Sequence, residues 1–223
     1  MTSKIKKKIK GKIKIAIDSP AAAGAGTLAK AISKHYNLFY LDTGKIYRYI
    51  ANLKLRNPKK WGLIFLKKKI NLLKIKDLEN KELISDKVGT EASIISKNIK
   101  IRKLVHSFQI NFAYNPPKRF KGSCLDGRDI TYNIVPDADF KFFITANIKT
   151  RALRRFKELK NSNNEISFVE VLKSIKKRDK SDFNRKVSPL KKTKDSVLIN
   201  TTNLSKRACF LKIKKIIDRK LNT

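Results

Sequence analysis

Arginines beside acidic residues are the first candidates for chemistry in this chain. Twelve of its 54 basic side chains are arginine, and the others are lysine. Two segments set arginine next to aspartate: DGRD at residues 126–129 and RDKSDFNR at residues 178–185. The planar guanidinium binds two phosphate oxygens at once and keeps its charge. Because phosphoryl transfer between polyanions depends on such clamping more than on acid–base chemistry, these segments indicate a phosphate-holding site.

A loop of small residues could hold further phosphate oxygens. Residues 12–18 (KIKIAID) predict a strand, residues 19–26 (SPAAAGAG) a turn, and the apolar spacing of residues 27–36 a helix. A helix start offers N–H groups and partial positive charge, and small residues let the backbone curl around an anion. This is the context that a phosphate-binding loop requires.

The loop departs from the usual pattern, G-x-x-x-x-G-K-[ST]. Ser19 stands at the first glycine, Ala25 at the lysine and Gly26 at the hydroxyl position, with Thr27 next. Taken alone, the loop fits an ordinary strand–turn–helix connection as well as a phosphate site. Other segments of the chain must therefore decide between the two interpretations.

Seven segments together resemble the bacterial cytidylate (CMP) kinase family. They occur in the family's order across residues 12–205, and the DGRD and RDxxDxxR segments are far more specific than the loop. Glycine followed by threonine, as at residues 26–27, is normal in nucleoside monophosphate kinases. The segments are Asp18 with Pro20 to Thr27, YLDTGKIYR at 40–48, Val88-Gly89 with Ala92-Ser93 and Arg102, LDGRDI at 125–130, Pro136-Asp137-Ala138, RDKSD at 178–182 with Arg185 and Ser188-Pro189-Leu190, and VLINTTNL at 197–204.

The resemblance implies an α/β fold of the P-loop kinase type, with a central parallel five-stranded sheet flanked by helices. The alternation of predicted strands and helices favours a parallel sheet independently of it. We expect residues 1–11 to be a basic lead-in and residues 12–223 to form one domain. Residues from about 43 to 120 would bind the nucleoside monophosphate, and those from about 151 to 185 would form a lid across the polar loop 161–165.

The resemblance also implies which residues bind each substrate. ATP phosphates would lie against Ser19, Pro20, Ala21, Ala22, Ala23, Gly24, Ala25, Gly26 and Thr27. The acceptor, CMP or dCMP, would be held by Thr43, Arg48, Ser93, Arg102, Arg128, Asp129, Arg178, Asp182 and Arg185. The catalytic charge would come from Arg128, Arg185, Arg154 and Arg155. Mg²⁺ would arrive with ATP near Thr27, ligated mainly by phosphates and water, so no metal site built by the protein is expected.

Within the acceptor set, the implied roles divide by chemistry. Arg48, Arg128 and Arg185 would hold the 5′-phosphate, Ser93, Arg102 and Asp129 would contact the cytosine edge, and Asp182 with Arg178 would hold the ribose. Asp129 can accept a hydrogen bond from the exocyclic amine of cytosine, which uracil lacks. For Asp129 and Asp182 the alternative is structural pairing with neighbouring arginines.

Ala25 is the main departure from the family, whose lysine at this position reaches the β- and γ-phosphates of ATP. One preorganised donor of this kind contributes on the order of 3 kcal/mol to the transition state, or roughly a hundredfold in rate. Either another cation replaces it, such as Lys12, Lys30, Lys45 or a lid arginine, or the protein is a weakened kinase or a CMP-binding relic. We favour retained activity, because both acceptor segments are intact.

The remaining elements follow from apolar spacing and from the Pro, Gly and Asn that punctuate it. Residues 56–87 are rich in lysine with scattered leucine and isoleucine, and the pattern does not place them. The predicted strands are 38–41, 123–125, 140–145 and 196–200. The predicted helices are 45–55, 91–112, 148–159, 168–179 and 205–221, the last with Ser205 as its N-cap.

Composition bounds the remaining possibilities. The formal net charge is +36 over 223 residues, but the lysines are spread along the whole chain, so we interpret them as a solvated surface. No apolar stretch approaches a membrane span, residues 1–14 lack the apolar run of a secretory signal, and Cys124 and Cys209 are far apart. We expect a cytoplasmic monomer without a specific nucleic-acid partner. A basic nucleic-acid-binding protein is the remaining alternative.

Overall fold

A five-stranded, wholly parallel sheet forms the centre of the molecule, as expected. The computed structural model describes residues 11–160 and 166–221, so the predicted lead-in up to residue 10 and the polar loop 161–165 lie outside the described residues. The strand order is β2-β3-β1-β4-β5. The strands are β1 (Ile13–Asp18), β2 (Phe39–Asp42), β3 (Gly122–Gly127), β4 (Phe140–Thr145) and β5 (Val197–Asn200).

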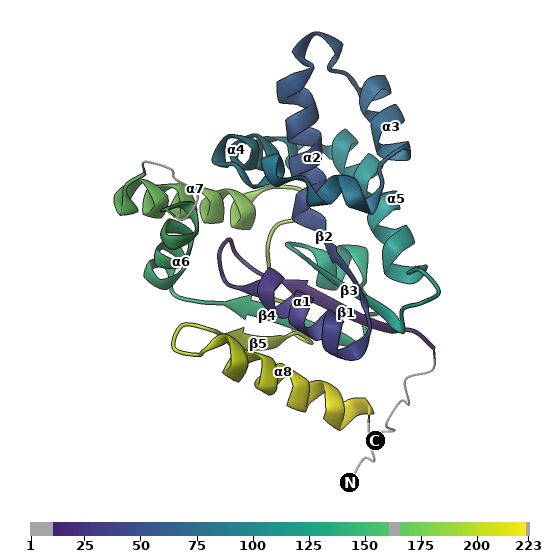
Figure 1. Cartoon of the computed structure of the whole chain (residues 1–223), viewed down its shortest axis with the longest axis vertical. Helices are drawn as coiled ribbons and strands as arrows, with labels where there is room; N and C mark the ends of the chain where they lie inside the picture. The colour runs from purple at the N-terminus through teal and green to yellow at the C-terminus, as the bar shows by residue number, and fades with distance from the viewer. Residues whose placement is uncertain (1–10, 161–165, 222–223) are drawn as a thin grey trace.

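Helices cover both faces of this sheet (Figure 1). Side chains of β1 alternate between the faces: Ile15 and Ile17 pack in the layer of α1 (Ala25–Tyr36) and α8 (Lys206–Leu221). Ala16 packs in the opposite layer, with the helices α2 (Thr43–Arg56) and α5 (Ile99–Tyr114). Burial on both faces explains why the central strand is apolar at successive positions.

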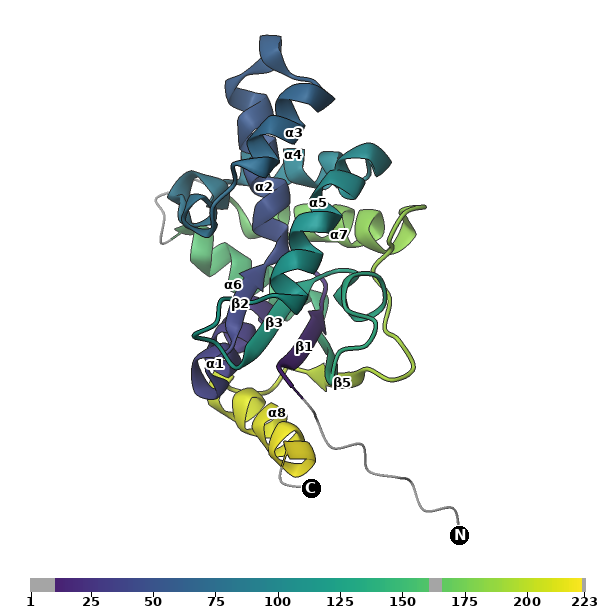
Figure 2. The same ribbon diagram turned by 90° about the vertical axis from the view of Figure 1, so that its right-hand side faces the viewer.

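Residues 57–98 form an inserted lobe above the sheet, at the top of Figure 1 and Figure 2. The sequence pattern did not place most of this segment. Leu66, Ile70 and Leu78 of this lobe are buried and join the same core as α2 and α5. Leu83 is also buried but lies outside that cluster. The elements are η1 (Pro58–Lys60), α3 (Leu63–Asn71), η2 (Ile75–Glu79), η3 (Lys81–Ile84) and α4 (Asp86–Ile95).

Two helix predictions were wrong. The single helix over residues 91–112 is two helices, α4 and α5, because the Asn98 side chain accepts from the N–H groups of Lys100 and Ile101 and starts a new helix. The helix predicted to end at residue 179 continues as α7 (Phe168–Asn184). Asp182, which was expected in the polar stretch after this helix, therefore lies on the helix one turn after Arg178.

A helical hairpin stands beside the sheet and carries its own small core. It consists of α6 (Ile148–Lys160) and α7, and Ala152, Leu159, Val171 and Ile175 pack between them. The hairpin and the inserted lobe lie on either side of the carboxyl ends of the strands (Figure 1). These ends are where ligands bind in open parallel sheets.

Candidate functional site

The loop after β1 has the backbone that a phosphate-binding loop needs. Gly24 has φ +91° at the start of α1, and Ala22 also has positive φ, +58°. The Ser19 N–H donates to the Gly127 carbonyl at 3.2 Å, which joins the loop to the end of β3. The first N–H groups of α1 have no acceptor within the helix, so the loop can cradle an anion.

Buried Asp18 links this loop to the segment that follows DGRD. Its carboxylate accepts from the Ile130 N–H at 2.8 Å, the Thr131 N–H at 2.9 Å and the Thr131 hydroxyl at 2.6 Å. Burial nevertheless outweighs these three bonds and raises the pKa of Asp18 to about 6. These bonds tie the end of β1 to the segment that follows β3.

Two arginines of α6 brace the loop through its carbonyl groups. Arg151 donates to the Ala21 carbonyl at 3.1 Å and pairs with Asp179 through both terminal nitrogens, at 3.0 and 2.5 Å. Arg154 donates to the Thr201 hydroxyl at 2.9 Å, and that hydroxyl donates to the Ala23 carbonyl at 3.0 Å. Carbonyls held in this way leave the loop N–H groups to face an anion.

Asp126 lies beside the start of α1, and the sequence analysis assigned it no role. It accepts from the Tyr40 hydroxyl at 2.9 Å, and a Cβ at Gly26 would lie 3.6 Å from its Oδ2. Burial and the nearby charge of Asp42 raise its pKa well above the usual range. Thr43 donates to the Asp126 carbonyl at 2.8 Å. The sequence feature that could have identified Asp126 as a site residue is its position at the carboxyl end of a buried strand.

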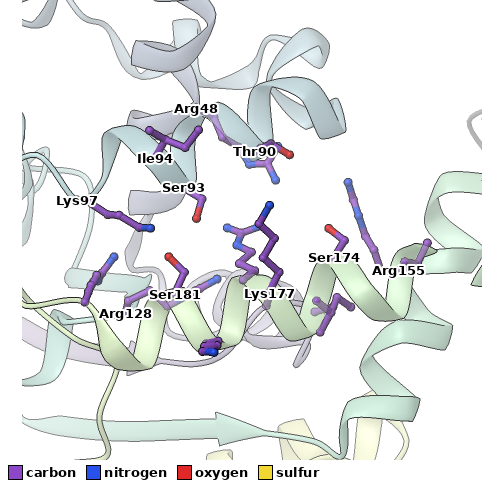
Figure 3. Close-up of a pocket in the computed structure, with 18 of the residues that line it drawn as sticks. Arg48, Thr90, Ser93, Ile94, Lys97, Arg128, Arg155, Ser174, Lys177 and Ser181 are labelled. Carbon is purple, nitrogen blue, oxygen red and sulfur yellow. The ribbon is translucent and has the colours of Figure 1, made fainter. Parts of the chain in front are cut away.

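A cavity of about 1150 Å³ lies between α4 and α7, next to the loop (Figure 3). It brings together many of the predicted site residues, from the inserted lobe, from the helical hairpin and from the loop after β1. The ones that line it are Ala21, Ala22, Arg48, Ser93, Arg128, Arg155, Arg178 and Arg185. Thr43, Arg102, Asp129, Asp182 and Arg154 do not line it directly, and Thr27 is exposed in the first turn of α1.

The predicted arginine–aspartate pairs form beneath the cavity. Arg128 Nε donates to Asp182 Oδ2 at 2.8 Å, and Arg185 lies 3.7 Å from the same carboxylate. Burial raises the pKa of Asp182, but the charges of Arg128 and Arg178 outweigh this effect and hold it below its usual value. Two of the arginines expected to bind phosphate are thus oriented by one buried carboxylate.

A second buried pair lies at the side of Tyr47. Arg102 Nη2 donates to Asp129 Oδ2 at 2.5 Å, and the Asn133 amide donates to the same oxygen at 2.7 Å. The Arg102 guanidinium lies 5.4 Å from the centre of the Tyr47 ring. Both of these bonds to Asp129 use Oδ2, which leaves Oδ1 as an acceptor. Structural pairing and a ligand contact are therefore compatible at Asp129.

Several polar atoms around the cavity are buried without a hydrogen-bond partner in the described structure: Arg178 Nε, Arg185 Nη2 and Tyr47 Oη. Burial and the charges of Arg128 and Arg48 lower the pKa of Arg178 to about 10. A buried guanidinium with an unsatisfied N–H is costly, and an anion relieves both the missing bond and the like-charge repulsion. This cluster is built to receive a negatively charged ligand.

Arg48 and Arg155 connect the inserted lobe to other parts of the site. Arg48 donates to the Leu83 carbonyl at 2.7 Å, and Arg155 of α6 donates to the Ile84 carbonyl at 3.4 Å. Ala25 is buried, and its side chain packs in the core with α1. Within the described ranges, no group of three or more His, Cys, Asp or Glu could hold a metal ion, and no helix is long and apolar enough to cross a membrane.

The strand order, the loop at the end of β1 and the arginine cluster define an α/β phosphate-binding-loop kinase. Residues 15–219 match the cytidylate kinase family model. A cytidylate kinase of Bartonella tribocorum is 41% identical, over 92% of this chain and 94% of that one. A cytidylate kinase of Mesomycoplasma hyopneumoniae is 38% identical, over 94% and 95%. The chain belongs to the cytidylate kinase family.

A solved structure supports the fold separately. The crystal structure of an uncharacterized protein from Eubacterium ventriosum superposes with a TM-score of 0.53 at 17% identity, over 92% of this chain and 98% of that one. At this identity the likeness bears on the fold alone.

Proposed function

We propose that this protein transfers the γ-phosphoryl group of ATP to the 5′-phosphate of CMP or dCMP. An oxygen of the acceptor phosphate attacks the γ-phosphorus, the bond from that phosphorus to the β–γ bridging oxygen breaks, and ADP leaves as CDP or dCDP forms. The observation that carries the proposal is the set of arginines at the cavity, of which Arg178 and Arg185 each have a buried N–H group without a partner in the described structure. Family membership supports the same reaction.

The acceptor phosphate would bind Arg48, Arg128 and Arg185, with Thr43 beside it. Asp182 supports this role, because it holds Arg128 in a fixed orientation at 2.8 Å and lies 3.7 Å from Arg185. The same carboxylate, with Arg178, would hold the ribose hydroxyls. Fixed guanidinium groups need no reorganisation when the phosphate charge changes during transfer.

Cytosine would be recognised by Ser93, Arg102 and Asp129. Ser93 points into the cavity from α4 (Figure 3). The free acceptor on Asp129 would take the exocyclic amine of cytosine, while Arg102 holds the carboxylate in place through its other oxygen. Uracil offers a carbonyl at this place and would leave the buried carboxylate without its donor.

ATP would bind through the backbone of residues 19–27, with Arg154 bracing the loop and Arg155 at the cavity edge. It would enter as its Mg²⁺ complex, with the ion ligated mainly by phosphates and water, and the ion would supply polarisation of the phosphoryl oxygens. The carboxylates of Asp126 and Asp42, next to the start of α1, fit an ion held there through water. We further propose a cytoplasmic monomer, consistent with two buried free cysteines.

A coupled assay tests the proposal, with MgATP and each of CMP, dCMP, UMP and AMP. We expect turnover with CMP or dCMP well above that with AMP or UMP, and loss of turnover in Arg128→Met. Arg207→Met, on the exposed side of α8, is the matched control and keeps wild-type turnover. Turnover with CMP no higher than with AMP would overturn the proposal. Calorimetric binding of CMP and ATP without turnover would instead identify the relic that Ala25 suggested.

A further inference from the structure

Lys177 lines the cavity but belongs to none of the segments that resemble the family. It lies on α7 with Ser174 and Ser181, three and four residues away, so the three share one face of the helix. Figure 3 shows this face turned to the cavity, with the Lys177 side chain extending towards Thr90 on α4. The side chain thus enters the cavity that is lined by both the loop and the arginine cluster.

Within the described parts of the chain, no hydrogen bond or ion pair of Lys177 is found. Among the other candidate cations for a missing loop lysine, Arg155 also lines the cavity but donates to Glu158 and to the Ile84 carbonyl. Lys12 donates to the Pro116 carbonyl at 3.0 Å, and Lys30 Nζ lies 6.0 Å from the centre of the Tyr40 ring. Neither of them, nor Lys45, lines the cavity. Arg154 does not line it either, since Thr201 holds it behind the loop.

We propose that Lys177 is the cation that contacts the transferred phosphoryl group in place of a lysine at position 25. The proposal rests on the kinase activity proposed above. The cavity wall runs from Ala21 and Ala22 of the loop to Arg128 of the acceptor cluster, and Lys177 lies on the helix that borders both. An ammonium group on a flexible stem can follow the phosphoryl group between donor and acceptor.

The electrostatic environment supports this role. Arg178, the next residue, lies among the positive charges of Arg128, Arg48 and Arg155, and its buried Nε has no partner in the described structure, so this part of α7 favours an anion. Four phosphate groups of the two substrates would supply the missing negative charge.

The experiment compares Lys177→Ala and Lys177→Arg with Lys176→Ala. Lys176 is the adjacent exposed lysine of α7 and does not line the cavity. The Lys176→Ala variant therefore removes the same charge from the same helix but not from the cavity. We expect Lys177→Ala to lower kcat on the order of a hundredfold, with a smaller change in the KM for CMP. Lys177→Arg keeps kcat within about tenfold because the charge remains. Lys176→Ala behaves as the wild type.

A binding measurement with inorganic tripolyphosphate separates this inference from the proposed function. Lys177→Ala is expected to weaken tripolyphosphate binding by about tenfold or more, with an unchanged melting temperature, even if no nucleoside monophosphate is turned over. Wild-type kcat and tripolyphosphate affinity in Lys177→Ala would overturn the role of Lys177. A Lys177→Arg variant as slow as Lys177→Ala would overturn it too, since charge would not be what matters.

Discussion

Buried carboxylates orient the cations of this site at the scale of single residues. Asp129 and Asp182 are almost fully buried, and each binds an arginine that is expected to contact the acceptor. Removing one partner of such a pair leaves an uncompensated buried charge, which costs more than the pair itself contributes. Substitutions here therefore affect stability and recognition together.

Asp129→Asn tests this coupling. The variant keeps the size of the side chain but leaves Arg102 buried without its counter-charge. We expect a loss of about 3 kcal/mol in the free energy of unfolding by urea, and at least a hundredfold loss of kcat/KM with CMP. Asp137→Asn is the control, because Asp137 pairs with Lys14 at the surface, and its loss should cost less than about 1 kcal/mol. Equal losses in both variants would contradict the role of burial.

Asp18 makes stability depend on pH. Its pKa is about 6 in the folded protein and near 3.8 when unfolded, so the folded state binds the proton more tightly between these values. The stability that Asp18 contributes is therefore complete below about pH 4 and is lost as the pH rises through 6. The unfolding free energy of the wild type, measured relative to that of Asp18→Asn, should fall by at most about 3 kcal/mol from pH 4 to 7.5. A difference independent of pH would contradict this.

Helix ends determine where the site residues lie at the scale of elements. Asn98 follows α4 and is the N-cap of α5. Ser93 therefore lies on one helix and Arg102 on the next. The continuation of α7 to Asn184 puts Arg178 and Asp182 on a helix that faces the inserted lobe across the cavity. The sequence pattern alone assigned Ser93 and Arg102 to one helix and Asp182 to a polar stretch, so it did not predict how these side chains are oriented.

Asn98→Ala tests the first of these ends. The substitution removes an acceptor for two N–H groups in the first turn of α5 and should cost about 1 kcal/mol of unfolding free energy. Because Arg102 lies in the next turn, the KM for CMP should rise as well. Lys100→Ala, in the same turn but exposed, should change stability by less than about 0.5 kcal/mol. An Asn98→Ala variant as stable as the wild type would show that the cap is dispensable.

The formal charge of +36 acts at the scale of the whole molecule. Most of it is lysine spread over the surface, whereas the cavity gathers a smaller set of half-buried arginines. Surface charge attracts any polyanion weakly and is screened by salt, but a buried cluster is screened much less. Binding to nucleic acid and binding to nucleotides should therefore respond differently to ionic strength.

A salt titration separates the two. The affinity for a short labelled DNA duplex, measured by fluorescence anisotropy, should fall by about a hundredfold or more between 50 and 200 mM salt, as counterion release requires. The affinity for CMP, measured by calorimetry, should fall only several-fold over the same range. Tight, sequence-selective duplex binding that survives the higher salt would instead favour the nucleic-acid alternative.

The sequence by itself determined the alternating α/β organisation, the five parallel strands and the motif residues at their ends. Apolar runs and turn residues are local signals, so strands such as residues 140–145 and the Ser205 cap follow from short segments. The DGRD and RDxxDxxR segments carried the family resemblance for the same reason. Each is a contiguous run whose residue types can be recognised without knowing what surrounds it.

The tertiary structure alone decided which charges meet. Residues 128 and 182, or 102 and 129, lie far apart in the chain, and only the packing of α5 and α7 near the end of β3 brings them into contact. It also decided that Lys12 faces Pro116 and that Lys177 enters the cavity. The sequence does not distinguish a functional lysine from a surface lysine in a lysine-rich chain. Orientation and burial distinguish them, and both depend on long-range packing.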